Sequence, residues 1–194
     1  MSDSDFLASL FDVNEIFLQY DFRPFGSKHP LERSTKPINT LIEALKEQGV
    51  TRFAATGYCF GGKNVIEMAI AGQIVAGAVN HPSRLNKPKD FERLLESGST
   101  TKILINAGEI DEQFPLEAQK EADTLLEGGK YKGGYKRVYW EGCTHGFAVR
   151  GDLVSDPSRA LNRDQPSFLQ SDPRVKAGME GAFKEAVELF NSTL

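Results

Sequence analysis

The sequence predicts an α/β protein with a mostly parallel sheet flanked by helices, in a single domain over residues 1–194. Two observations support this prediction. Short apolar runs of strand length alternate along the chain with amphipathic segments of helix length, which is the order of strands joined by crossover helices. Glycines and prolines lie between most of these segments, where turns are expected.

The predicted strands are short and apolar. They cover residues 53–55, 75–80, 102–106 and 135–140. Residues 102–106 read Lys-Ile-Leu-Ile-Asn, typical of a buried strand, and residues 135–140 are rich in aromatic and β-branched side chains. A further strand is expected within residues 15–22, although the first 35 residues form an atypical N-terminal segment.

The predicted helices have an apolar face and end near glycine or a polar residue. They cover residues 38–48, 63–71, 88–96, 115–127 and 173–190. In the last of them one stripe should face the core. That stripe consists of Val175, Met179, Phe183, Val187 and Phe190. Residues 128–134 and 151–173 are expected to be surface connectors.

The most informative motif joins the first predicted strand of this series to the next helix. It reads Gly57-Tyr58-Cys59-Phe60-Gly61-Gly62. A nucleophile flanked by glycines between a strand and a helix predicts a nucleophile elbow, a sharp turn whose flanking positions have little room for side chains. Its apex, Cys59, would be lifted above the sheet, and the N–H of Phe60 would face an oxyanion. The motif favours acyl transfer by a thiol over a merely buried cysteine.

The same residues also fit the frame of a phosphate-binding loop. Gly57 and Gly62-Lys63 have the required spacing, but Asn64 stands where that motif needs a Ser or Thr hydroxyl to bind magnesium. A nucleotide-binding function is therefore the remote alternative.

An acid and a base follow later strands. Asp111 comes after the strand at 102–106, and His145 comes after the strand at 135–140. The carboxyl ends of parallel strands meet at one edge of the sheet, so these residues should gather beside Cys59. Nucleophile, acid and base in this chain order predict a Cys-His-Asp triad. Glu109 and Glu112 are the competing candidates for the acid.

Other side chains near this edge are candidates to contact a substrate. His81 ends the strand at 75–80 and could line the pocket or be a structural histidine. Tyr58 lies beside the nucleophile, and Phe147 lies close to His145.

The chain from about residue 36 to 194 resembles the dienelactone hydrolase family, in the variety common in fungi. The resemblance rests on Gly57–Lys63, on Gly108-Glu109-Ile110-Asp111 and on the segment from Thr144 to Asp152. It implies an α/β-hydrolase fold with a shortened N-terminal half, a Cys59/His145/Asp111 triad, no metal or organic cofactor, and hydrolysis of a small lactone or activated ester. The source of the second oxyanion donor is left open.

The resemblance also bears on how a substrate is held. Bacterial members of the family hold a substrate carboxylate partly through an arginine four residues after the catalytic histidine. Val149 occupies that position here, and Arg150 follows it. Carboxylate binding by Arg150 and a purely structural arginine are both open. A catalytically impaired relative that acts as a binding or interaction protein is the alternative function.

Composition limits the partners. The 194 residues carry a net charge of −4 and no basic block, which argues against nucleic acid, and no apolar run could span a bilayer. The acidic N-terminus shows no secretion signal, so a cytoplasmic location is expected. The two cysteines, Cys59 and Cys143, suit a reducing compartment, with a disulfide between them as the minor alternative, and their spacing with His145 is poor for zinc. A reduced N-terminal half would expose a sheet edge, so a homo-oligomer is expected.

Overall fold

The computed structural model describes residues 30–150 and 173–194, except for the side chain of Arg150. The chain divides into two compact units, residues 1–45 and residues 46–194. The predicted strand at 15–22 lies outside the described residues, as does nearly all of the predicted connector at 151–173. Within the described ranges no helix is both long and apolar enough to cross a membrane.

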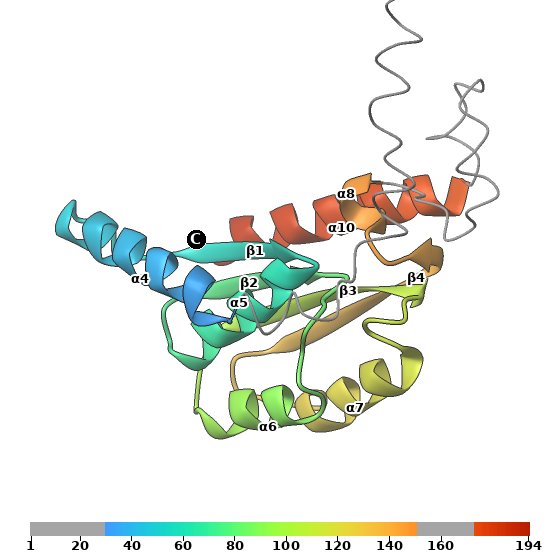
Figure 1. Ribbon diagram of the computed structural model, residues 1–194, viewed down its shortest axis with the longest axis horizontal. Coiled ribbons are helices and arrows are strands. Elements are labelled where there is room, and N and C mark those ends of the chain that lie inside the picture. The colour runs from blue at the N-terminus through green and yellow to red at the C-terminus, as the bar shows by residue number, and fades with distance from the viewer. Residues whose placement is uncertain (1–29, 151–172) are drawn as a thin grey trace, which may run out of the picture. The chain divides into compact units, whose positions relative to one another are not determined.

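Helix α4 (Glu32–Glu47), blue in Figure 1, begins six residues before the predicted start at residue 38. The prediction placed Pro37 just ahead of the helix, whereas Pro37 lies inside it. The reason is that the carbonyl of Leu31 accepts the backbone N–H and the hydroxyl of Ser34, at 3.0 and 2.8 Å, which closes a turn upstream of the proline.

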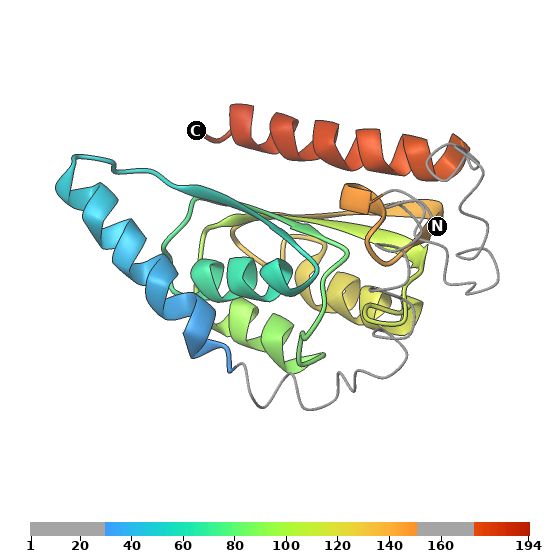
Figure 2. The same ribbon diagram turned by 45° about the horizontal axis from the view of Figure 1, so that its top comes forward.

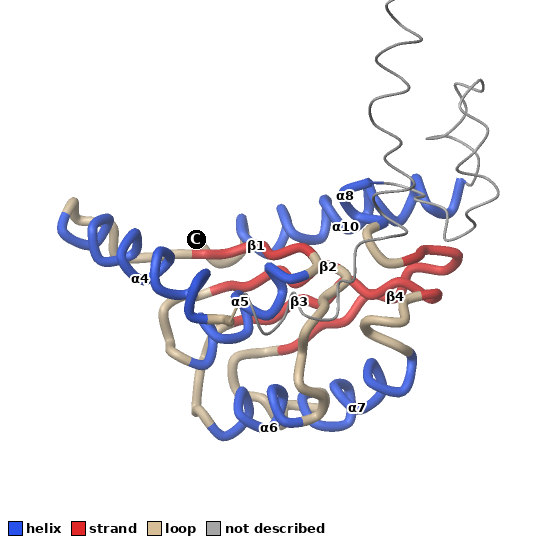
Figure 3. The backbone as a smooth tube through the Cα atoms, viewed as in Figure 1, coloured by secondary structure: helices blue, strands red, loops and turns tan. Residues whose placement is uncertain are grey.

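The second unit contains a four-stranded parallel sheet in the order β1-β2-β3-β4, shown as red segments in Figure 3. The strands are β1 (Ala54–Tyr58), β2 (Ala76–Asn80), β3 (Lys102–Ile110) and β4 (Tyr135–Thr144). The helices are α5 (Phe60–Ile70), α6 (Lys89–Glu96), α7 (Leu116–Leu126), α8 (Phe147–Arg150) and α10 (Pro173–Asn191). The predicted parallel sheet flanked by helices is confirmed.

The helices cover both faces of this sheet. Figures 1 and 2 show α5, α6 and α7 on one face and α10 on the other. The main core lies between the sheet and helices α5, α6 and α7. It includes Ile66, Phe91, Ile105 and Phe114, all fully buried. A sheet covered on both faces needs strands that are apolar on both sides, and every residue of β2 is buried accordingly.

The face that α10 turns toward the core differs from the predicted stripe. Its buried residues are Val175, Gly178, Ala182 and Ala186, whereas Phe183 is 67% exposed. The physical reason is close approach. A Cβ at position 181 would overlap the ring of Trp140, and a Cβ at position 178 would overlap Sγ of Cys143, so α10 approaches the sheet through glycine and alanine.

Strands β3 and β4 extend four residues past their predicted ends. Their pairing continues through an irregularity, in which Gly108 pairs with Trp140 and Ile110 pairs with Thr144. The extra residues of β4 form a bulge at Gly142, whose φ is 70°. A Cβ at Gly108 would lie 2.5 Å from the carbonyl oxygen of Cys143, so the bulge needs glycine there. Asp111 and His145 consequently follow directly on the last residues of these strands.

A chain of side-chain hydrogen bonds crosses the sheet on the α10 side. Asn80 Nδ2 donates to Thr56 Oγ1 at 3.1 Å, and Asn106 Nδ2 donates to Asn80 Oδ1 at 2.8 Å. Trp140 Nε1 in turn donates to Asn106 Oδ1 at 3.0 Å. Each strand contributes one residue, and the buried side-chain amides of Asn80 and Asn106 have hydrogen-bond partners as a result.

Candidate active site

Cys59 alone connects β1 to α5, which is the sharp turn expected of an elbow. Its φ of 52° and ψ of −117° are unfavourable for a residue with a side chain. Backbone hydrogen bonds at its N–H and at its carbonyl hold this conformation. The N–H of Cys59 donates to the carbonyl of Asn80 at 3.1 Å. The carbonyl of Cys59 accepts the N–H groups of Gly62 and Ser83 at 3.1 and 3.0 Å. The thiol therefore lies at the N-terminus of α5, where the helix dipole favours a thiolate.

The glycines around Cys59 are not equivalent. A Cβ at Gly57 would overlap the backbone carbonyl of Gly61, and a Cβ at Gly62 would lie 2.9 Å from Cβ of Pro82. At Gly61 itself, nothing lies within 4 Å of the position that a Cβ would take. The expected lack of room is thus found at Gly57 and Gly62, but not at Gly61, because the helix turns that position outward.

The structure places Asp111 against His145. Nδ1 of His145 donates to the Asp111 carboxylate at 2.9 and 3.0 Å, and Oδ1 of Asp111 also accepts the N–H groups of Gln113 and Phe114 at 2.8 and 3.1 Å. Glu109, a competing acid, accepts the N–H of Gly142 at the bulge instead, at 2.7 Å. With Nδ1 occupied, Nε2 is the nitrogen of His145 left to act on the thiol.

The acid–base properties of Cys59 and His145 are shifted toward an ion pair. Hydrogen bonding with His145 outweighs burial and, with help from Ser83, His145's charge and the N–H of Phe60, lowers the pKa of Cys59 to about 7. Burial works to lower the pKa of His145, but the hydrogen bond and charge of Asp111, together with Cys59, raise it to about 9. Between these values the thiolate and the imidazolium coexist.

The other predicted site residues take different positions. His81 is 1% exposed, with φ of 36°, and its ring meets those of His145, Phe147 and Tyr58 at centroid distances of 5.1, 5.7 and 5.9 Å. His81 thus lies behind His145. Phe147 is fully buried, and Tyr58 is partly exposed beside Cys59. Arg150 ends α8, and its side chain is outside the described part of the chain.

The sequence prediction missed Ser83. Its Oγ lies 3.3 Å from Sγ of Cys59, and the residue is 6% exposed. Ser83 is three residues beyond β2, at the same sheet edge as the elbow. A serine after a proline is an ordinary loop signal, so only the topology of the sheet could have drawn attention to it.

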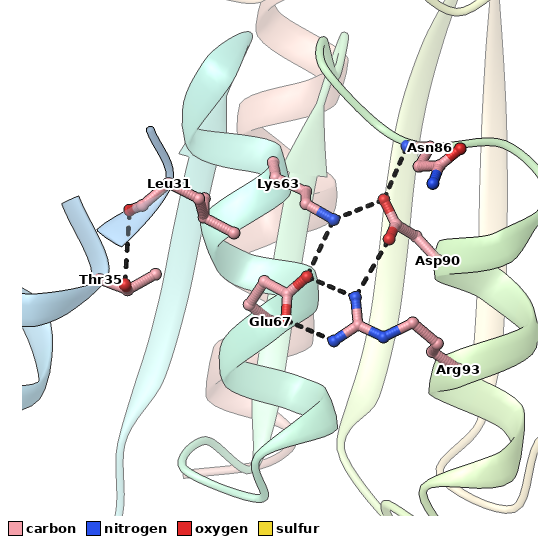
Figure 4. Close-up of polar contacts among 7 residues, drawn as sticks. All are labelled: Leu31, Thr35, Lys63, Glu67, Asn86, Asp90 and Arg93. Carbon is pink, nitrogen blue, oxygen red and sulfur yellow. Dashed lines mark hydrogen bonds and ion pairs between the residues drawn. The ribbon is translucent and has the colours of Figure 1, made fainter. Parts of the chain in front are cut away.

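The structure does not suit the phosphate-loop alternative. One residue separates β1 from α5, which leaves no loop to surround a phosphate. The lysine of that motif is also engaged elsewhere: Lys63, 9% exposed, contacts Asp90 at 2.6 Å and Glu67 at 2.8 Å (Figure 4). Arg93 contacts the same two carboxylates and completes the network.

Both cysteines, Cys59 and Cys143, are free, so the disulfide alternative is not found.

The family model described as "Dienelactone hydrolase family" matches residues 22–194. The chain belongs to the dienelactone hydrolase family. Two relatives are fungal: hydrolase tropI of Talaromyces stipitatus is 28% identical over 88% of this chain, and hydrolase pyvD of Aspergillus violaceofuscus is 33% identical over 72% of it. The matches cover 58% and 54% of those proteins, so this chain spans little more than half of their length.

Solved structures show the same fold. The crystal structure of a protein described as "Putative Dienelactone Hydrolase", from Klebsiella pneumoniae, is similar over 80% of this chain and 59% of its own, with a TM-score of 0.56 and 15% identity. A monoacylglycerol lipase of Paleococcus ferrophilus covers 84% of this chain and 76% of its own, with a TM-score of 0.52 and 14% identity. The fold is that of the α/β hydrolases, as the sequence predicts.

Proposed function

We propose that the chain hydrolyses a small lactone or activated ester, with Cys59 as nucleophile, His145 as general base and acid, and Asp111 as the residue that orients His145. The observation that carries the proposal is the placement of a thiol with a lowered pKa beside an imidazole that a buried carboxylate holds by Nδ1. Family membership supports the reaction class.

In the first half of the reaction the Cys59 thiolate forms a bond from Sγ to the carbonyl carbon, and the carbonyl electrons move onto oxygen. The N–H of Phe60, at the start of α5, would donate to that oxyanion. When the oxyanion collapses, the C–O bond to the leaving alkoxide breaks and the alkoxide takes a proton from His145. In a lactone, that alcohol stays attached to the acyl group.

In the second half, neutral His145 takes a proton from water, and the hydroxide formed attacks the thioester carbonyl. The C–S bond then breaks and the acid leaves. The departing thiolate is stabilised by the imidazolium, which Asp111 in turn stabilises. The resting ion pair is thereby restored.

The test combines an activated aryl ester, iodoacetamide and intact-mass analysis. We expect turnover of the ester and a single alkylation at Cys59, both lost in Cys59→Ala. Cys143→Ala is the matched control, because Cys143 is buried against α10 and should be dispensable for both. Alkylation at Cys59 without any turnover would favour the alternative, a binding or interaction protein. Labelling and turnover that persist in Cys59→Ala would refute the proposal.

The expected self-association stays a prediction. Light scattering over a dilution series measures it: a molar mass that rises with concentration above that of one chain supports a homo-oligomer, and one chain's mass throughout contradicts it.

A further inference from the structure

Four consecutive residues after β2, His81 to Arg84, lie against the elbow. His81 contacts the ring of His145, and Pro82 occupies the space that a side chain at Gly62 would need. The guanidinium of Arg84 lies 5.1 Å from the centroid of the Phe60 ring. The segment therefore touches the base and the residues that follow the nucleophile.

Ser83, in the middle of this segment, is attached to Cys59 at two points. Its backbone N–H donates to the carbonyl of Cys59 at 3.0 Å, and its hydroxyl lies 3.3 Å from Sγ. The backbone two residues earlier is fixed as well, because the N–H of His81 donates to the carbonyl of Asn106 at 2.8 Å. Because these hydrogen bonds constrain the backbone, they limit the positions that the Ser83 hydroxyl can take, and the observed position is in contact with Sγ of Cys59.

The chemistry of this contact depends on the charge of the sulfur. A thiolate has no proton to donate, so the Ser83 hydroxyl must then be the donor. A hydrogen bond to a charged acceptor is stronger than one to a neutral acceptor, and this contact therefore favours the thiolate over the thiol. In a residue as buried as Ser83, water cannot readily replace the hydroxyl.

We propose that Ser83 is a further active-site residue, whose hydroxyl stabilises the Cys59 thiolate and positions Sγ beside His145. The assignment rests on the proposed function insofar as Cys59 is the nucleophile. The assignment goes beyond the triad because the sulfur then has two hydrogen-bond donors: the hydroxyl of Ser83, which follows β2, and the imidazolium of His145, which follows β4.

The experiment measures the rate of Cys59 alkylation by iodoacetamide against pH, which reports the thiolate fraction without requiring any ester turnover. Ser83→Ala removes the hydroxyl and keeps the backbone N–H. We expect the apparent pKa of Cys59 to rise by about one unit. Ser83→Thr keeps a hydroxyl and should stay near the wild-type value. Ser99→Ala is the matched control, since Ser99 is another buried serine whose hydroxyl contacts Thr101.

An unchanged apparent pKa in Ser83→Ala would overturn the assignment, as would a shift in Ser83→Thr as large as that in Ser83→Ala. A shift in Ser83→Ala and none in Ser99→Ala supports it, whether or not the protein turns over the ester. Failure of the proposed function and failure of the Ser83 assignment are therefore separate results, the first read from ester turnover and the second from alkylation.

Discussion

Both carboxylate oxygens of Asp111 lie within hydrogen-bond distance of Nδ1 of His145, at 2.9 and 3.0 Å. Two backbone N–H groups, from Gln113 and Phe114, hold the carboxylate in turn. The orientation of the imidazole is thus set by the backbone that follows β3.

Asp111→Asn should reduce the rate of ester hydrolysis by at least about a hundredfold, because the amide cannot stabilise the imidazolium as a carboxylate does. Cys59 should still be alkylated, with its apparent pKa shifted upward. Glu109→Gln is the control, since Glu109 binds the bulge at Gly142. Steady-state kinetics measure both variants, and greater damage from Glu109→Gln would mean that the acid is misassigned.

The pH dependence should show two limbs. The pKa of Cys59 is lowered to about 7, so kcat/KM should rise as pH increases through 7 and the thiolate forms. The pKa of His145 is raised to about 9, so kcat/KM should fall above pH 9 as the imidazolium loses the proton that the leaving group needs. Alkylation needs only the thiolate and should show the lower limb alone. An alkylation rate that rises with a midpoint at pH 9.0, the ordinary pKa of a thiol, would contradict the ion pair.

Gly57 and Gly61, two residues before and after Cys59, should respond differently to alanine. Gly57→Ala places a methyl group against the carbonyl of Gly61 and should destabilise the protein by about 3 kcal/mol, with loss of fast alkylation at Cys59. Gly61→Ala meets open space in a helix and should raise stability by about 0.5 kcal/mol. Urea unfolding measures both. Equal destabilisation by the two changes would be inconsistent with the turn described above.

Lys63 should matter for stability and not for chemistry. Lys63→Met leaves Glu67 and Asp90 with one cation fewer in a buried network and should cost about 3 kcal/mol. Alkylation at Cys59 should persist under conditions in which the variant is folded. Lys184→Met, at a side chain that is 76% exposed, should change stability by less than about 0.5 kcal/mol. A stable Lys63→Met variant with no reactive Cys59 would assign the lysine to the site instead.

The sequence was sufficient to predict which residues lie at one edge of the sheet, because residues that directly follow parallel strands all lie at the carboxyl edge of the sheet. That is why Cys59, Asp111 and His145 could be grouped before any contact was known. The buried face of α10 was predicted correctly only at Val175: hydrophobicity also pointed to Phe183, whereas close packing against Trp140 and Cys143 selects glycine and alanine. Ser83 was missed because its contact with Cys59 is made across the fold and leaves no periodic pattern in the sequence.

The hydrogen-bond chain from Thr56 through Asn80 and Asn106 to Trp140 has a consequence for how this protein can change over time. Sliding one strand by a single residue would turn its polar side chain to the other face of the sheet, and sliding by two would separate the partners by about 6.6 Å. Either change leaves buried amides without partners. The relative heights of the strand ends are therefore fixed inside the sheet, so the positions at which Cys59, Asp111 and His145 leave their strands can stay constant while residues farther along the loops change.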